Sequence, residues 1–372
     1  MECRRLNSVV IVGIFGFLLF VSGLVLPRIV KARDVPVAPL ADERADAELP
    51  IRVIIAAYLE SGVIGATIGR LRDQLALDVN PESDVLVIAS DEPTASAART
   101  AGAFVVVQDR RGKAAALNSG VALSQGHIIL LTDANTEILP QDWPARLRSD
   151  LSRIDLVSAT KEETGSKEDA YWALERSIKA RTVNNECQQT LAVVGEFVGF
   201  RYSDWRDIPA RTVIDDFQIA LSFSSRGLVV GVDTGIRVLE PATTGIEQWG
   251  RRIRISSGVI SEGLRAAPEL FRTSVGRAFL AHKVYRQTIG AVGFWIAVVC
   301  LSLFWPPYSL TVVIIGVALC VTVYTSRWRV SRIVEAVATG ISLQLVPIFG
   351  ALSAVRRLWR RGAGNGWRKV KR

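Results

Sequence analysis

The side chains best suited to chemistry lie in one short segment, residues 109–138, which reads DRRGKAAALNSGVALSQGHIILLTDANTEI. It opens with a basic loop that contains Lys113, passes through residues that favour a helix, and ends in an apolar strand followed by Asp133 and Asn135. Oxygen-bearing side chains at the carboxyl end of a buried strand lie where open α/β sheets bind ligands. Such oxygens suit a hard cation that bridges phosphates. An ordinary strand–helix–strand crossover closed by a polar turn would show the same pattern.

Two further clusters of charge follow downstream. Asp215 and Asp216 stand directly before an apolar helical segment, where carboxylates can simply cap the helix. A neighbouring carboxylate or a partly dry site also raises the pKa of a carboxyl group toward neutrality, which suits a general base. Residues 247–254 are rich in arginine, which can stabilise a departing diphosphate or lie on a membrane surface.

The elements that position these residues can be read from the apolar pattern. From residue 51 onward, short apolar runs alternate with segments of helical spacing. This alternation predicts an α/β fold with a mostly parallel sheet covered on both faces. The predicted strands are 51–56, 85–89, 104–107 and 128–131, and the predicted helices are 63–77, 94–101 and 114–123.

Both ends of the 372-residue chain are strongly apolar. Residues 9–26 form an apolar run long enough to cross a bilayer. Basic residues follow it at once and no small-residue cleavage site is present, so we expect a retained anchor rather than a signal peptide. Residues 289–305 and 308–325 are two further candidate spans, separated by Pro306 and Pro307, and residues 333–355 are a third. A buried helical hairpin of a soluble protein is the alternative.

The net charge of +9 is concentrated in the last residues of the chain. Residues 356–372 carry eight Lys and Arg side chains and no acid, which leaves +1 for the remainder. Because Trp359 and Trp367 are interleaved with this charge beside an apolar segment, the tail suits an anionic headgroup layer, and we expect no nucleic-acid partner. With only two histidines and four cysteines without spaced partners, any metal must be held mainly by oxygen.

These patterns divide the chain into six parts. In order, they are an N-terminal anchor (1–31), a linker rich in Pro, Ala and acid (32–50), a catalytic domain (51–260), amphipathic helices at the interface (261–288), C-terminal membrane segments (289–355) and a basic tail (356–372).

The motifs and their order resemble those of membrane-bound bacterial family 2 glycosyltransferases, relatives of the hyaluronan, chitooligosaccharide and exopolysaccharide synthases. The resemblance implies a GT-A fold, a nucleotide-sugar donor and Mg²⁺ or Mn²⁺. Three positions depart from the family pattern: Leu59 stands in place of Asn, Asn135 in place of a second Asp, and Arg252 in place of Trp. We therefore expect a weakly held metal, and the resemblance to the processive synthases does not extend to their Trp.

The resemblance also implies a role for each motif. Donor binding falls to Ala57, Tyr58, Glu60, Asp91, Lys113, Asn118 and Asp133, and the metal to Asp133 and Asn135. Asp91 is expected to read uracil, although a helix cap would explain it equally well. The acceptor loop contains Gly195, Glu196 and Phe197, and the closing motif contains Gln248, Arg251 and Arg252. Asp216 is expected to be the base, with Asp215 as its orienting neighbour.

The predicted activity is inverting transfer of a sugar from a UDP-sugar to a growing surface polysaccharide or oligosaccharide. Two alternatives stay open: a single addition to a lipid-linked acceptor, and an inactive membrane scaffold in a synthase complex. The expected partners are the donor, a saccharide or lipid-linked acceptor, membrane lipids and other polysaccharide-synthesis proteins. The expected location is the bacterial inner membrane, with several spans and a cytoplasmic catalytic domain.

Overall fold

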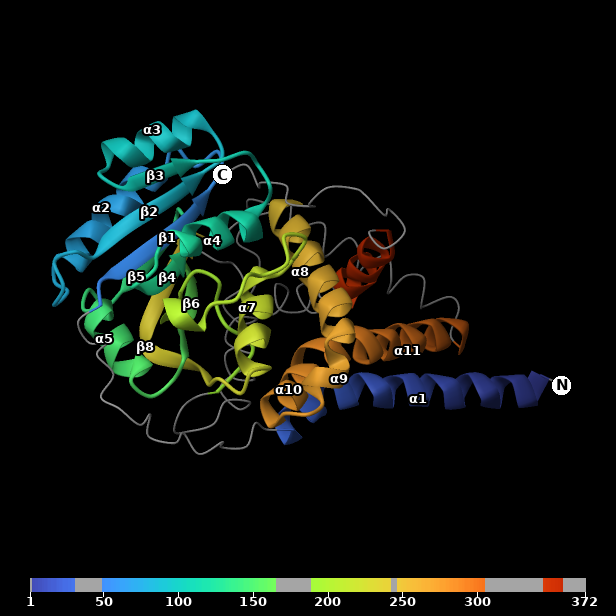
Figure 1. Ribbon diagram of the computed structural model, residues 1–372. Coiled ribbons are helices and arrows are strands. Elements are labelled where there is room, and N and C mark those ends of the chain that lie inside the picture. The colour runs from blue at the N-terminus through green and yellow to red at the C-terminus, as the bar shows by residue number, and fades with distance from the viewer. Residues whose placement is uncertain (1, 31–48, 165–188, 242–245, 305–343, 357–372) are drawn as a thin grey trace.

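The computed structural model describes residues 2–30, 49–164, 189–241, 246–304 and 344–356. Its first half alternates parallel strands with helices as predicted, and each predicted element is found within two residues of its expected bounds (Figure 1). The strands are β1 (Ile51–Ala57), β2 (Asp84–Ala89), β3 (Phe104–Val107) and β4 (Ile128–Thr132), and the helices are α2 (Ile64–Leu75), α3 (Glu92–Thr100) and α4 (Lys113–Ala122).

The second half turns the sheet into a mixed one. Its elements are β5 (Glu137–Leu139), α5 (Trp143–Leu151), β6 (Leu156–Thr164), β7 (Val198–Arg201), α7 (Asp215–Ser224) and β8 (Val230–Pro241). The strand order is β3-β2-β1-β4-β7-β6-β8-β5. Strands β3, β2, β1 and β4 are parallel, whereas β7 runs antiparallel to both β4 and β6. The expected parallel sheet therefore describes the first four strands, and β7 reverses direction where the two halves meet.

Apolar residues on both faces of the sheet form two cores. Along β1, Ile54 packs on one face while Val53 and Ile55 pack on the other, because side chains alternate along a strand. One core includes residues of α4 and α7, and the other includes residues of α2, α3 and α5. With β1 and β4 in the interior of the sheet, their carboxyl ends lie between the helical layers, where a ligand can approach.

A group of helices follows the sheet and packs onto the first of these cores. It comprises α8 (Ile246–Arg265), α9 (Ala267–Leu270), α10 (Ser274–Phe279), the π-helical segment η3 (Leu280–Gly290) and α11 (Ala291–Phe304). Phe279 of α10 stacks on Phe217 of α7 with ring centroids 4.5 Å apart. The boundary predicted at residue 260 falls inside α8, and the helices predicted to lie at an interface contribute Leu270, Phe279 and Val284 to the core.

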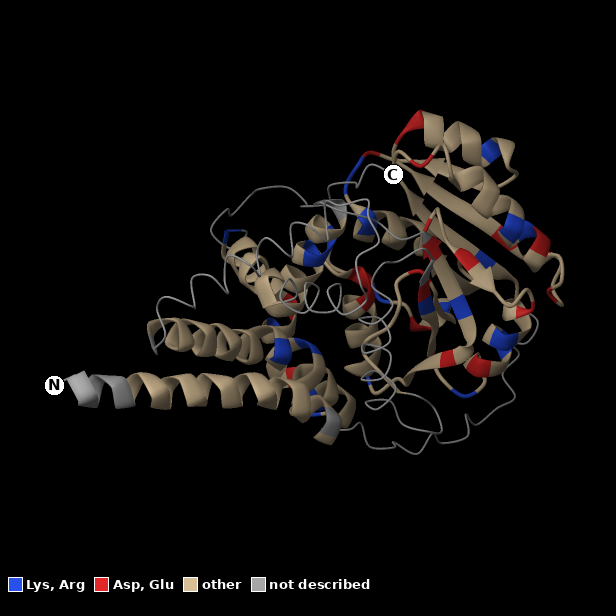
Figure 2. Ribbon diagram, turned by 180° about the vertical axis from the view of Figure 1, so that it is seen from behind, with Lys and Arg blue, Asp and Glu red and all other residues tan. Residues whose placement is uncertain are grey.

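Two stretches are long and apolar enough to cross a membrane by length and composition, Ser8–Pro27 of α1 (Glu2–Ile29) and Ser274–Leu303. Helices α1 and α11 lie side by side and extend away from the sheet (Figure 1), and neither Ser8–Pro27 nor α11 carries a charged residue (Figure 2). The predicted span 308–325 and the tail 356–372 fall outside the described residues, except that Arg356 ends a helix over residues 344–356.

Helix α1 contacts both α11 and the end of η3 backbone to backbone through glycines. A Cβ on Gly293 would lie 2.6 Å from the carbonyl oxygen of Gly16, and one on Gly23 would lie 3.2 Å from the Cα of Gly290. Small residues allow this approach, which is how apolar helices gain packing without a hydrophobic driving force.

We expect Gly293→Leu to separate these helices, since its side chain would overlap the backbone of α1. Overpacking of this kind costs about 1–3 kcal/mol. Thermal unfolding of the full chain in detergent measures the effect. Val292→Leu is the matched control, because Val292 is its neighbour on the same helix and 57% exposed. Equal melting temperatures for the two variants would contradict the close contact.

Candidate active site

The carboxyl ends of β1, β2 and β3 form the first part of the site. Tyr58 follows β1, and the guanidinium of Arg110, which follows β3, lies 4.2 Å from the centre of its ring. Ala57 is the buried last residue of β1, and Glu60 begins the turn into α2, where its backbone N–H donates to Thr94 Oγ1 at 2.9 Å. An aromatic ring and a guanidinium at this edge form a flat, cationic surface of the kind that a nucleotide base can contact.

Asp91 caps a helix, which is the alternative given for it above. Its Oδ1 accepts a hydrogen bond from Thr94 N at 3.0 Å, and its Oδ2 accepts one from Leu59 N at 2.6 Å. The carboxylate therefore joins the turn after β1 to the start of α3. Its expected contact with a uracil ring stays a prediction.

The turn after β1 shows why asparagine is usual at the position that Leu59 occupies in this chain. Leu59 has a φ of 57°, and it is the one non-glycine residue with positive φ among those that the structure describes. Asparagine tolerates this left-handed region, whereas leucine adopts it at a cost of about 1–2 kcal/mol. The bond to Asp91 holds the strained residue in place.

We expect Leu59→Asn to stabilise the protein by about 1 kcal/mol, because it relieves this strain and the replaced side chain is 54% exposed. Thermal unfolding tests it. Leu77→Asn provides the control, since Leu77 is 63% exposed and its φ is not positive. A Leu59→Asn protein no more stable than the Leu77→Asn protein would contradict the assigned strain.

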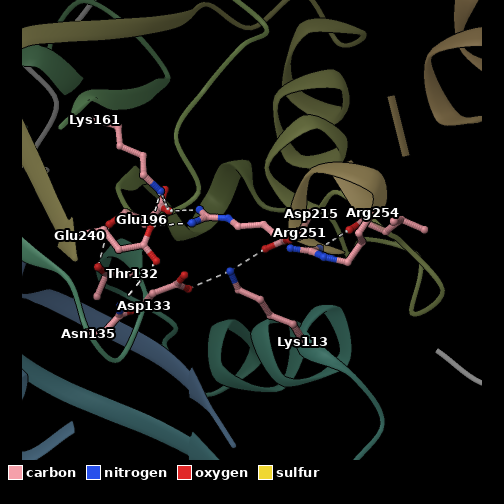
Figure 3. Close-up of polar contacts among 11 residues, drawn as sticks. Lys113, Thr132, Asp133, Asn135, Lys161, Glu196, Asp215, Glu240, Arg251 and Arg254 are labelled. Carbon is pink, nitrogen blue, oxygen red and sulfur yellow. Dashed lines mark hydrogen bonds and ion pairs between the residues drawn. The ribbon is translucent and has the colours of Figure 1, made fainter. Parts of the chain in front are cut away.

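Lys113 joins the two acidic motifs of the site (Figure 3). Its Nζ lies 2.9 Å from Asp133 Oδ1 and 3.0 Å from Asp215 Oδ2. Gly112, with φ at 99°, precedes it and provides a backbone conformation that other residues rarely adopt. Burial by itself would lower the pKa of Lys113, but Asp133 and Asp215 outweigh it and hold that pKa above its usual value.

Asp215 and Asp216 are neighbours whose pKa values move in opposite directions. Burial raises the pKa of both, but Lys113 and Arg254 hold the pKa of Asp215 below its usual value. Burial, Asp215 and Glu196 raise the pKa of Asp216 to about 6. Asp215 is thus a fixed anion, while Asp216 can gain and lose a proton near neutral pH. Gly195 faces Asp216, because a Cβ on this glycine would lie 3.4 Å from the Asp216 Cβ.

A second cluster of four charged side chains lies beside the first (Figure 3). Lys161 of β6 forms ion pairs with Glu196 and with Glu240 of β8. Arg251 of α8 reaches the same two carboxylates, at 3.4 Å from Glu196 and 3.1 Å from Glu240. The backbone carbonyl of Glu196 accepts a hydrogen bond from Thr132 Oγ1 at 2.7 Å, so this cluster is tied to the end of β4.

Six of the residues predicted for the site lie together in this region. Lys113, Asp133, Asn135, Glu196, Asp215 and Arg251 all appear together in Figure 3. Arg251 is paired with carboxylates in this structure, so it fastens α8 to the sheet. Gln248 is buried on the same helix, and Arg252 is partly exposed.

Two of the residues predicted to contact a substrate make other contacts in this structure. Asn118 was expected to bind the donor, but both polar atoms of its amide bond to the backbone of Ile208, at 2.9 and 3.1 Å. Phe197 was expected to contact the acceptor, but its side chain is fully buried and packs edge-on against Trp143. Asn118 therefore fixes a loop to α4, and Phe197 belongs to the core.

Lys161 and Glu240 are site residues that sequence reasoning missed, and Arg254 was noted only as part of the arginine-rich stretch 247–254. Glu240 carried a usable signal, because it continues the inward alternation of Ile236 and Val238 along β8. A carboxylate at an inward position of an apolar strand requires charged partners. Arg254 donates to the Val213 carbonyl at 3.1 Å, and it lies one helical turn after Arg251.

The sequence of residues 52–208 matches the family described as Glycosyl transferase family 2. The similarity to this family is confined to that segment, which is less than half of the 372-residue chain. The matched segment contains Lys113, Asp133 and Gly195, and it ends before Asp215 and Arg251. The fold is GT-A with apolar helices at both ends, and the protein is an enzyme of the glycosyltransferase class.

Solved structures extend the likeness in fold. The mannosyltransferase PcManGT from Pyrobaculum calidifontis, in complex with GDP-Man and Mn²⁺, is 18% identical with a TM-score of 0.67, and the match covers 94% of this chain and 100% of that one. Mannosyl-3-phosphoglycerate synthase from Rubrobacter xylanophilus is 16% identical with a TM-score of 0.42, over 59% of this chain and 76% of that one. At 18% identity, the match to PcManGT shows a shared fold. No curated protein sequence matched the chain.

Proposed function

We propose that the protein is an inverting, metal-dependent glycosyltransferase that moves a sugar from a nucleotide donor to a saccharide at a membrane. The observation that carries this proposal is the position of Asp216 beside Asp215. The ammonium of Lys113 forms ion pairs with both Asp215 and Asp133. A carboxyl with a pKa of about 6 and a fixed cation lie in one site, and Gly195 faces that carboxyl.

The donor would lie along the carboxyl ends of β1 to β4. Tyr58 and Arg110 are placed to contact the base, and Lys113, at the first turn of α4, is placed to contact the diphosphate. The N-terminus of a helix favours anions through its N–H groups and dipole. UDP is the nucleotide that the family resemblance favours, while the mannosyltransferase noted above was solved with GDP-Man.

Asp133 and Asn135 would hold the metal. Both offer hard oxygen donors at the end of β4, which suits Mg²⁺ or Mn²⁺. Within the described residues no group of three or more His, Cys, Asp or Glu side chains is placed to hold a cation, so a donor diphosphate would have to complete the set. The metal would neutralise charge on the diphosphate as it leaves.

In transfer, Asp216 accepts the proton of an acceptor hydroxyl as that oxygen attacks the anomeric carbon. The bond between this carbon and the diphosphate breaks, and its electron pair stays on the diphosphate oxygen. Attack from the face opposite the leaving group inverts the anomeric configuration. Asp215 stays ionised beside Lys113, and its negative charge keeps Asp216 basic enough to accept the proton.

The direct test is release of nucleoside diphosphate by the purified full chain in detergent. A panel of UDP-sugars and GDP-mannose is supplied with Mn²⁺, with Mg²⁺ or with a chelator, together with saccharide acceptors. We expect release with one donor, and loss of that release with the chelator. Absence of release with every donor and metal would favour the inactive scaffold instead.

A single addition to a lipid-linked acceptor is a second candidate, which Arg252 favours because an aromatic platform is missing there. The length of the product decides between the two, since a processive enzyme yields long chains from one acceptor.

We further propose that α1 and the Ser274–Leu303 helix anchor the domain at the cytoplasmic face of a bacterial inner membrane, where nucleotide sugars are made. We propose that residues 333–355, given above as a candidate span, are re-entrant or lie at the interface, because this leaves the basic tail on the same side. A reporter active only in the periplasm, fused after Arg372, should stay silent.

A further inference from the structure

Glu240 is a buried carboxylate that contacts three elements of the site. Its side chain is 2% exposed. It pairs with Lys161 of β6, with Arg251 of α8 at 3.1 Å, and with the Asn135 amide, whose Nδ2 lies 3.5 Å from Glu240 Oε1 (Figure 3). In the transfer proposed above, Asp216 takes the proton and Glu240 has no assigned role.

The charges of this cluster balance. Lys161 and Arg251 contribute two positive charges, and Glu196 and Glu240 contribute two negative ones. Lys161 and Arg251 can only donate hydrogen bonds, so the carboxylate of Glu240 acts as an acceptor in this cluster. A neighbouring amide can therefore approach Glu240 only with its NH₂ group. This requirement sets the orientation of Asn135.

We propose that Glu240 is a positioning residue that orients Asn135, so that donation by Nδ2 to Glu240 turns Oδ1 away from Glu240 and presents it as an oxygen ligand. This inference rests on the proposed function, in which Asn135 helps to hold the cation. It also accounts for asparagine in place of the usual aspartate, since an aspartate would place a second carboxylate beside Glu240 without a proton to share.

Glu240→Gln changes the group that faces residue 135 from an acceptor to a donor, while the side chain keeps nearly the same shape. Lys161 and Arg251 are obligatory donors, so they attract Oε1 of the new glutamine and turn its NH₂ group toward residue 135. The Asn135 amide must then rotate to accept with Oδ1, which points Nδ2 at the cation. A nitrogen that carries two hydrogens cannot bind a metal.

Asn135→Asp in the Glu240→Gln protein should restore the ligand. One oxygen of the new carboxylate accepts from the glutamine NH₂ group, and the other faces the cation. The exchange moves one negative charge from residue 240 to residue 135 and leaves the net charge unchanged.

The experiment measures Mn²⁺ binding to the full chain in detergent by electron paramagnetic resonance, which reports free Mn²⁺, in the presence of saturating UDP and, in parallel, GDP. Loss of an outer ligand partner weakens metal affinity by about 10–100-fold, and we expect a loss of this size for Glu240→Gln. The double variant should bind Mn²⁺ close to wild type. Binding of the nucleotide without metal should be the same in all proteins.

Glu162→Gln serves as the control, because Glu162 neighbours Lys161 on β6 and pairs with Arg237 in an exposed position. Circular dichroism confirms that each variant is folded. If Glu240→Gln binds Mn²⁺ as wild type does, or if Asn135→Asp fails to rescue it, the inference is wrong. If wild-type protein binds no Mn²⁺ with either nucleotide, the proposed metal role fails as well.

Discussion

Asp216→Asn should lower the rate of sugar transfer by about 10²–10⁴, because loss of a general base typically costs that much. Asparagine keeps the shape of the side chain but cannot take the hydroxyl proton. Donor binding should be unchanged, since Asp216 acts on the acceptor. Steady-state kinetics at saturating donor, together with calorimetric binding of the nucleotide, measure both effects.

The pH dependence of the wild-type enzyme gives an independent check. The base must be ionised, so with the pKa of Asp216 at about 6 the rate should fall as pH drops below 6. The rate of the Asp216→Asn variant should not show this fall below pH 6. Asp73→Asn, an exposed change on α2, is the control and should preserve both rate and profile. A wild-type profile in the Asp216→Asn protein would assign the base elsewhere, with Asp215 next to test.

Stability should move in the opposite direction from activity. Folding raises the pKa of Asp216 from 3.8 to about 6, so the native state binds more protons than the unfolded chain between these values. The stabilisation is therefore complete at low pH and is lost as pH rises through 6. At pH 7 the ionised, buried carboxylate of Asp216 destabilises the folded state. The inactive Asn variant should therefore unfold at or above the wild-type temperature.

Lys113→Met should both destabilise the protein and abolish donor binding. It leaves Asp133 and Asp215 without the ammonium that lies 2.9 and 3.0 Å away. Removing one member of a buried charge cluster costs up to about 3–5 kcal/mol. The partial exposure of Asp133, at 30%, places the expected loss toward the lower end. Thermal unfolding and nucleotide titration measure the two effects.

A second substitution separates charge from packing. Asp215→Asn in the Lys113→Met protein removes a carboxylate that has lost its partner, so part of the stability should return while donor binding stays lost. Lys113→Arg keeps the charge and should stay the most stable of these variants. If the double variant were less stable than Lys113→Met alone, the ion pair with Asp215 would not be the source of the loss.

The sequence alone predicted the elements of the first half of the sheet, because their information is local. Short apolar runs such as residues 51–56, and helical spacing in residues 63–77, reflect burial on a strand and a helix. Lys113, Asp133, Asp215 and Asp216 were also recognisable one by one, since each stands at a strand end or a helix start where polar groups meet ligands.

Tertiary structure decided which of these side chains meet and which way each one faces. No local pattern shows that Lys113 bridges Asp133 and Asp215, because the two carboxylates approach it only when α7 packs beside α4. The same holds for Asn118, which was expected at the donor and instead bonds to Ile208. A side chain beside a turn can point to either of two surfaces, and packing alone selects one.

The buried cluster around Glu240 is the clearest case of this limit. Lys161, Glu196, Glu240 and Arg251 come from two strands, a loop and a helix, and each would be an ordinary surface charge if its element packed elsewhere. Sequence specifies apolar faces through the hydrophobic effect, which needs no particular partner. Buried charges need specific partners, so their pairing is settled only where the folded chain brings distant elements together.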